Sequence, residues 1–87
     1  MKVAVWDTYV RRLDGKLMHF DILVPDTLKD TQVIFGYGKE YLSSKSFQTG
    51  KLSAEECAFC HIEIAPIPVI DGITEKGYYI IEMENCL

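Results

Sequence analysis

The segment Cys57-Ala58-Phe59-Cys60-His61 holds the densest group of reactive side chains in the sequence. Two thiols and an imidazole at this spacing are compatible with three chemistries: covalent attachment of a c-type haem, thiol–disulfide exchange, or half of a structural zinc site. Each of these needs further features elsewhere in the chain, and those features decide between them.

Neither haem attachment nor redox chemistry is favoured for this segment. Haem attachment normally follows export, and alternation along a strand would send Cys60 and His61 to opposite faces. A redox pair places its first thiol at the start of a helix, where the positive end of the dipole lowers the thiol pKa. Here the capping box at 53–56 predicts a short helical turn that ends near Cys57. We therefore expect Cys57 to be a poor nucleophile.

A zinc site would need ligands from distant strands to complete the two thiols. If a metal were bound, we would expect Cys57, Cys60 and His19 to hold it, with His61 or Cys86 as alternatives. Because a second ligand pair is missing, we predict that the cysteines act as small buried hydrophobic residues. No metal is favoured and no cofactor is expected.

His19, Asp21 and His61 form a second chemically capable group. A histidine exchanges protons near neutral pH, and a neighbouring carboxylate fixes its tautomer. Asp7 lies between Val5 and Tyr9 on the side we assign to the core, where we expect hydrogen bonds to satisfy it. The alternative for Asp7 is an acid of raised pKa at the edge of a cleft. The sequence contains no Gly-rich phosphate loop, nucleophile elbow or His-Glu-x-x-His motif, so no catalytic residue is assigned.

These side chains must be positioned by four predicted strands, at residues 2–10, 17–24, 60–65 and 78–84, rich in β-branched and aromatic residues. Asp14-Gly15 predicts a two-residue hairpin turn between the first two strands. A helix is expected over 31–45, capped by Asp30, and a shorter one after Pro66 and Pro68, closed by Gly77. The β-β-α-β-α-β order predicts a single α+β domain over 1–87. We expect a two-layer sandwich with a four-stranded, mainly antiparallel sheet and two helices on one face.

The hairpin turn sets which side chains share a face. A two-residue turn pairs Leu13 with Lys16, which places Phe20 and Ile22 beneath the helices. The opposite, open face would then carry the candidate binding residues: Trp6, Thr8, His19, Asp21, His61, Glu63 and Tyr78, with Glu82 beside them. One open face of an antiparallel sheet is normally polar and solvated. The large aromatic residues on it favour a contact surface instead.

Four segments carry a resemblance to a known family: Trp-Asp-Thr-Tyr-Val at 6–10, Met-His-Phe-Asp at 18–21, Lys-Glu-Tyr-Leu at 39–42 and Glu-Cys-Ala-Phe-Cys-His at 56–61. The chain resembles, over most of its length, a small bacterial family catalogued as a domain of unknown function, number two-thousand-and-twenty-four in that series. The resemblance implies a compact two-layer α/β fold. It implies no activity and no catalytic residues.

Composition and charge narrow the function further. The 87 residues carry a formal net charge of −4, which argues against a nucleic-acid partner. The longest later apolar stretch, Ala65 to Ile70, is too short for a membrane span. With no secretory signal and an odd number of cysteines, we expect a cytoplasmic protein with reduced thiols.

We therefore predict a small cytoplasmic protein that acts as a non-enzymatic interaction module. Its open face would contact a protein partner or a second copy of the chain. One alternative is a small ligand-binding protein or enzyme that uses the His/Asp cluster on that face. Another is a zinc-binding module that uses the Cys-x-x-Cys-His segment.

Overall fold

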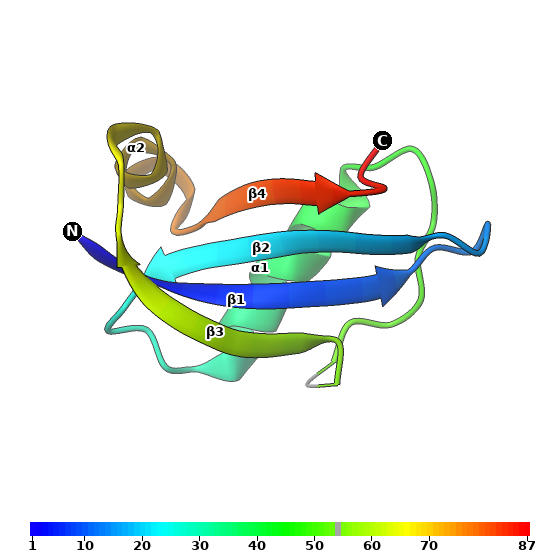
Figure 1. Ribbon diagram of the computed structural model, residues 1–87, viewed down its shortest axis with the longest axis horizontal. Helices are drawn as coiled ribbons and strands as arrows, with labels where there is room; N and C mark the ends of the chain where they lie inside the picture. The colour runs from blue at the N-terminus through cyan, green and yellow to red at the C-terminus, as the bar shows by residue number, and fades with distance from the viewer. Residues whose placement is uncertain (54) are drawn as a thin grey trace.

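A computed structural model describes residues 1–53 and 55–87. The elements are β1 (Lys2–Arg11), β2 (Leu17–Pro25), α1 (Thr31–Ser43), β3 (Cys57–Ile64), α2 (Ile67–Lys76) and β4 (Tyr79–Glu84). The four strands form one sheet in the order β3-β1-β2-β4, and every neighbouring pair is antiparallel (Figure 1). The predicted α+β class and element order are confirmed. In the described part of the chain, no helix is both long and apolar enough to cross a membrane.

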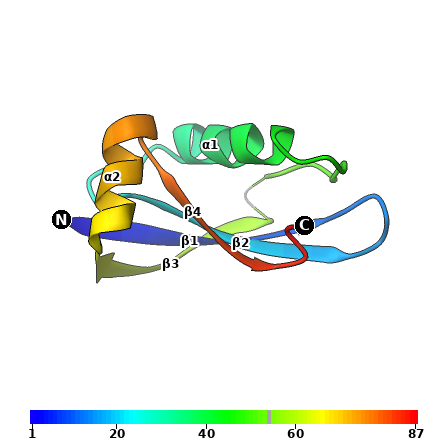
Figure 2. The ribbon, with the colours of Figure 1, turned by 90° about the horizontal axis from the view of Figure 1, so that it is seen from above.

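Helix α1 lies along one face of the sheet, as its apolar residues predict (Figure 2). It begins at Asp30, whose side chain accepts a hydrogen bond of 3.0 Å from the backbone amide of Gln32. Its buried residues join Phe20 and Ile22 of β2 in the main hydrophobic core. Gly38 allows this close approach, because a Cβ there would lie 3.0 Å from Cδ1 of Ile22 on β2 and 2.4 Å from Cδ2 of Leu52. We call this side of the sheet the α1 face.

Helix α2 packs against the other side of the sheet, whereas we expected both helices on one face. Val69 and Ile73 of α2 form a second core with Val3, Val5 and Leu23. Side chains alternate along a strand, so these three sheet residues point away from the α1 face. Figure 2 shows α2 standing across the end of the sheet where β1 begins. The strands are apolar on both faces at this end, and α2 covers the second apolar surface.

The hairpin between β1 and β2 has a different turn from the one predicted, which changes the register. The amide of Gly15 donates to the carbonyl of Arg12 (3.0 Å), and the amide of Arg12 donates to the carbonyl of Lys16 (2.8 Å). Gly15 has a φ of +93°, and Asp14 is not in the left-handed region. This is a three-residue loop with a glycine bulge rather than a two-residue type I′ turn, which needs two positive φ values. The extra residue turns every side chain of β1 to the opposite face.

The register therefore corrects the predicted faces of β1. Thr8 lies opposite Phe20 and Trp6 opposite Ile22, so both face α1. Asp7 lies directly opposite Asp21 and shares its face. The β2 alternation was predicted correctly, since Phe20 is fully buried under α1.

The faces of β4 are also the reverse of those predicted. Ile80 pairs with Ile22 and packs against the main core, whereas Tyr79 and Ile81 pack with the α2 core. Tyr78, just before the strand, is 6% exposed and stacks on Tyr37 of α1 at a centroid distance of 4.6 Å. Residues 78–81 are four consecutive apolar residues, which fit either orientation of β4. Alternation alone could therefore not decide which of their side chains face α1.

Candidate functional site

Three polar side chains meet on the face opposite α1, which we call the open face. Asp7 comes from the middle of β1, and His19 and Asp21 come from β2. Asp7 and Asp21 are direct cross-strand partners, and His19 pairs with Tyr9 one step further along the hairpin. Residues i and i+2 on a strand share a face, so the hairpin register alone brings the three together. We name Asp7, His19 and Asp21 the open-face triad.

The triad is compact and half-buried. Nε2 of His19 lies 3.7 Å from Oδ1 of Asp7 and 3.5 Å from Oδ1 of Asp21. The ring of Tyr9 stacks on His19 at a centroid distance of 4.0 Å and fixes the imidazole plane. Nε2 of His19 and Oδ1 of Asp21 are buried atoms without a hydrogen-bond partner among the described residues. The distances from Nε2 of His19 to the two carboxylate oxygens exceed those of normal hydrogen bonds. The fold therefore leaves these buried polar atoms without hydrogen bonds.

The pKa values of the two aspartates in the triad shift in opposite directions. Burial, together with the hydrogen bond and the charge of Asp7, raises the pKa of Asp21 to about 6. The hydrogen bond from Asp21 lowers the pKa of Asp7. Like charges that face each other directly across two strands repel, and one proton between them relieves the repulsion. Between about pH 4 and pH 6 the pair therefore holds a proton that an isolated aspartate would release.

A β-bulge brings a second polar group to the same face. The register between β1 and β3 shifts between Val5 and Trp6, because Val5 pairs with His61 and Trp6 with Phe59. Cys60 occupies the extra position, and its Sγ lies 3.0 Å from Nδ1 of His61. The two side chains are thus neighbours, whereas strict alternation predicted opposite faces.

Charge around the bulge keeps the Cys60 thiol protonated. A hydrogen bond to Asp7, then burial and nearby carboxylates, raise the pKa of Cys60. On the other side of the His61 ring, Nε2 lies 3.2 Å from a carboxylate oxygen of Glu63. Glu63 and His61 pair with Val3 and Val5, which point away from α1, so both lie on the open face, as the sequence predicts.

Three of the predicted site residues, and Glu82 beside them, do not lie on the open face; Glu82 pairs with Phe20 and accepts a hydrogen bond from Tyr41 of α1. Trp6 is partly buried against the main core and makes an edge contact with Phe59 at 5.8 Å. Thr8 is fully buried on the α1 face. Tyr78 lies against α1 and is not on the open face. The hairpin loop length and the orientation of β4 cause these corrections.

Cys57 and Cys60 lie on opposite faces of the sheet, so they cannot form the zinc site with His19 that the Cys-x-x-Cys spacing left as an alternative. Cys57 is buried in the main core, where Oγ1 of Thr8 donates to its Sγ at 3.3 Å. Burial raises the pKa of this thiol. All three cysteines of the described residues are free thiols. Because Cys57 faces α1, it cannot share an ion with His19 on the other side of the sheet.

Sequence reasoning missed Asp7 as a partner of His19 and Asp21. The ligand atoms of the triad all lie within 4.8 Å of one another. Tetrahedral ligands at about 2.0–2.2 Å from an ion lie about 3.3–3.6 Å apart, close to the two measured separations from His19. The energetic cost of burying Asp7 under α1 was the available signal, since it favours a register that places this carboxylate outside the core.

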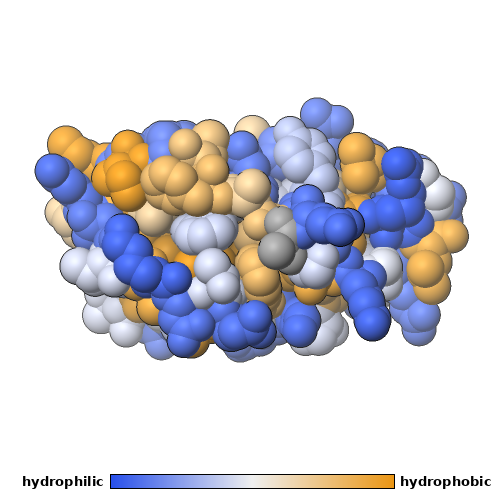
Figure 3. Space-filling model, turned by 90° about the horizontal axis from the view of Figure 1, so that it is seen from below, coloured by the Kyte–Doolittle hydropathy of each residue, from blue (hydrophilic) through white to orange (hydrophobic). Residues whose placement is uncertain are grey.

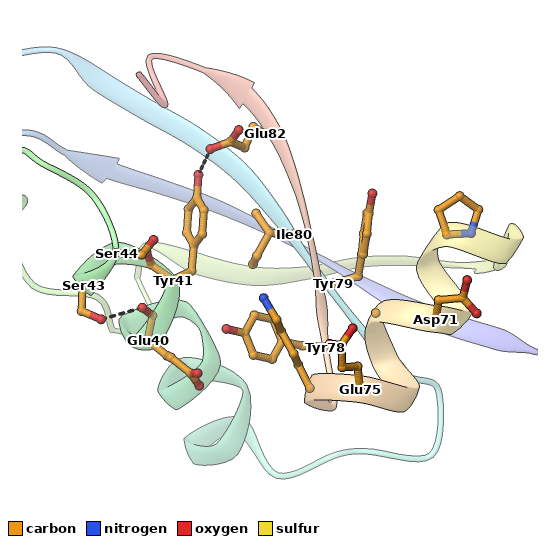
Figure 4. Close-up of a pocket in the computed structure, with 13 residues that line it drawn as sticks. Glu40, Tyr41, Ser43, Ser44, Asp71, Glu75, Tyr78, Tyr79, Ile80 and Glu82 are labelled. Carbon is orange, nitrogen blue, oxygen red and sulfur yellow. Dashed lines mark hydrogen bonds between the residues drawn. The ribbon is translucent and has the colours of Figure 1, made fainter.

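A groove on the surface of the molecule is separate from the triad. It lies between α1 and α2 over β4 and has a volume of about 760 Å³. Figure 4 shows Tyr41, Tyr78, Tyr79 and Ile80 lying between the two helices. Tyr41 donates a hydrogen bond to Glu82, which is also paired with Lys45. The groove is lined by α1, α2 and β4 and includes no residue of the triad.

The fold defines the class of protein: a small α+β domain in which a four-stranded antiparallel sheet carries one helix on each side. Residues 1–83 match the family described as Domain of unknown function (DUF2024), and the chain belongs to that family. No curated protein matches the chain. The NMR structure of protein NE1680 from the bacterium Nitrosomonas europaea is similar, with 42% sequence identity, a TM-score of 0.83 and all of both chains covered.

Proposed function

We propose that the protein binds a divalent transition-metal ion on its open face through Asp7, His19 and Asp21. The observation that carries the proposal is the buried, unpartnered pair of atoms, Nε2 of His19 and Oδ1 of Asp21, with Oδ1 of Asp7 at 3.7 Å. One imidazole nitrogen and two carboxylate oxygens form a ligand set used by zinc and related ions.

Replacement of a proton by an ion explains why the triad is tolerated in the fold. In the metal-free protein below about pH 6 the two aspartates reduce their repulsion by holding one proton, as the raised pKa of Asp21 indicates. A divalent cation would neutralise both carboxylates and would use the free nitrogen of His19. Binding should therefore release a proton and strengthen with rising pH until the pair is ionised.

The ligand chemistry and the access route favour a transition metal over calcium or magnesium. Hard cations prefer six or more oxygen ligands, whereas imidazole suits zinc, cobalt, nickel, copper and iron. The Asp7 side chain is 37% exposed, compared with 14% for Asp21, so an ion would enter from the Asp7 side. Water would occupy the remaining coordination positions. Tyr9 holds the imidazole plane by stacking, as a supporting residue would.

A cobalt and zinc titration tests the proposal. Metal-free protein titrated with Co²⁺ should develop d–d absorption at one equivalent, and Zn²⁺ should displace the Co²⁺. His19→Gln should abolish this binding. His61→Gln is the matched control, because His61 is an exposed histidine outside the triad, and this variant should bind as the unmodified chain does. A signal that survives His19→Gln and disappears in His61→Gln would contradict the proposal.

A second function, association through the free edge of β3, is favoured by a separate observation. In the described residues β3 pairs only with β1, so its outer edge is unpaired. Phe59, Ile62 and Ile64 are 52%, 42% and 78% exposed. Figure 3, viewed from the side on which β3 lies in Figure 1, shows hydrophobic side chains gathered among hydrophilic ones. Natural edge strands usually carry charges or proline, and this one carries only Glu63 and no proline.

The partner for this edge would be a second copy of the chain, paired antiparallel through β3. The other edge, β4, ends in Glu82 and Glu84, whose like charges oppose self-association. Sedimentation at several concentrations should show a dimer that Ile62→Lys dissociates. Val33→Lys, at another exposed apolar residue, should leave the dimer intact. A chain that remains monomeric at millimolar concentration would remove this second function.

A further inference from the structure

The groove between α1 and α2 is a built cavity that the proposed metal site does not use. Its volume of about 760 Å³ falls within the usual range for small-molecule sites, about 300–1,000 Å³. α1 and α2 form its two walls, and β4 and the residue before it form its floor. The groove is therefore a second candidate binding site.

The floor of the groove is formed in part by Tyr78. The residue is 6% exposed and lines the groove, so its side chain is held in place by its surroundings while its hydroxyl can meet a ligand. Its ring is held by stacking on Tyr37. Burial, and then the charge of Glu40, raise the pKa of Tyr78, so the hydroxyl stays protonated. It can donate to a ligand acceptor or accept from a ligand N–H.

The remaining lining is aromatic and acidic. Tyr41 and Tyr79 add two further aromatic rings, and Tyr79 lies so close to α2 that a Cβ at Gly72 would be 2.6 Å from Cδ1 of its ring. Four carboxylates and one ammonium group line the groove: those of Glu40, Asp71, Glu75, Glu82 and Lys76. Aromatic faces and carboxylates together attract organic cations. In Figure 4, Glu75 and Tyr78 face the space between the helices.

The arrangement of the carboxylates favours an extended organic cation over a metal ion. Among the described residues, no three metal-ligating groups in the groove lie within 4.8 Å of one another, unlike the open-face triad. The carboxylates come instead from separate elements: Glu40 from α1, Glu75 from α2 and Glu82 from β4. Glu82 is already engaged by Tyr41 and Lys45. Glu40 and Glu75 stand on the two walls of the groove, an arrangement that suits a chain with separated ammonium groups.

We propose that the groove between α1 and α2 binds an aliphatic polyamine, with its ammonium groups at Glu40 and Glu75 and its methylene chain over Tyr78 and Tyr79. This inference is independent of the proposed metal site. Lys76 lines the same groove, and its ammonium group would compete with the ligand for the carboxylates.

Titration with spermidine tests this inference, with calorimetry for affinity and NMR of the tyrosine ring protons for location. Spermidine should bind at one equivalent and shift the ring signals of Tyr78 and Tyr79. Glu40→Gln and Glu75→Gln should each weaken binding about two- to fivefold, as expected for partly exposed ion pairs. Lys76→Met should strengthen it by a similar factor.

The controls separate a built site from general attraction of cations. Glu63→Gln removes an exposed carboxylate on β3, at the opposite edge of the sheet from the groove, and should leave spermidine binding unchanged. The neutral 1,8-octanediol should not bind. Mg²⁺ at matched ionic strength should compete no better than Na⁺. Equal weakening by Glu63→Gln and Glu75→Gln, or full displacement by Mg²⁺, would show non-specific charge attraction and overturn the inference.

Discussion

Asp21→Asn should stabilise the metal-free protein near neutral pH, because it replaces a largely buried carboxylate of the sheet by a neutral amide of the same shape. The pKa of Asp21 in the folded protein is about 6, compared with an ordinary value of 3.8. Between these two values the folded state binds more protons than the unfolded state, so stability falls as pH rises. The stability contributed by the protonated form is complete below pH 3.8 and is lost as pH rises through about 6. An asparagine keeps a donor for Asp7 at every pH.

The size of this effect follows from the pKa difference. At about 1.36 kcal/mol per pKa unit, ionising Asp21 costs at most about 3 kcal/mol of folding free energy. Because the Asp21 side chain is 14% exposed and solvent screens the Asp7 charge, we expect about 1–2 kcal/mol. Asp21→Asn should therefore raise the free energy of unfolding by this amount at pH 7.5 and change it little at pH 4.

Urea denaturation followed by Trp6 fluorescence, with chelator present, measures this difference at each pH. Asp71→Asn is the matched control, because Asp71 is exposed on α2 and the variant changes the net charge equally. It should show no comparable gain between pH 4 and 7.5. A loss of stability in Asp21→Asn at pH 7.5, or a difference independent of pH, would refute the shared-proton account of the triad.

Three further substitutions test the fold that positions the site, each by urea denaturation. Phe20→Ala should cost about 3–5 kcal/mol, because Phe20 is fully buried under α1, and a loss below about 1 kcal/mol would mean that α1 covers the other face. Arg12→Lys should cost about 1–3 kcal/mol, because the Arg12 guanidinium donates hydrogen bonds to the carbonyls of Asn85 and Leu87 and lies 3.6 Å from the centre of the Phe47 ring. An unchanged urea midpoint would contradict that role. Gly38→Ala should destabilise by about 1–3 kcal/mol through overpacking, and a gain in stability would show that the helix can shift.

Local signals in the sequence predicted the elements well. Asp30 marks the start of α1, because its side chain accepts a hydrogen bond from a helix amide. Gly77 marks the end of α2, because it adopts a positive φ. The alternation in β2 was informative because one parity, including Phe20, is almost entirely apolar. Each of these features is decided within a few residues.

The faces of the other strands depend on details that alternation does not contain. Asp14-Gly15 is compatible with two loop lengths that differ by one residue, and that residue turns β1 over. The bulge at Cys60 depends on pairing with β1, a long-range contact. The triad needed the β1 register, so two of its members were predicted and Asp7 was not. Comparing the cost of burying Asp7 with that of burying Trp6 would have favoured the observed register.

The position of a bound metal ion tests the central claim of this account most directly. Crystals of the protein grown with Zn²⁺ and measured above and below the zinc absorption edge would locate the ion by anomalous scattering. We expect one peak within about 2.0–2.2 Å of Nε2 of His19 and of carboxylate oxygens of Asp7 and Asp21. A peak only at His61 and Cys60, or no peak at saturating zinc, would contradict the proposed metal site.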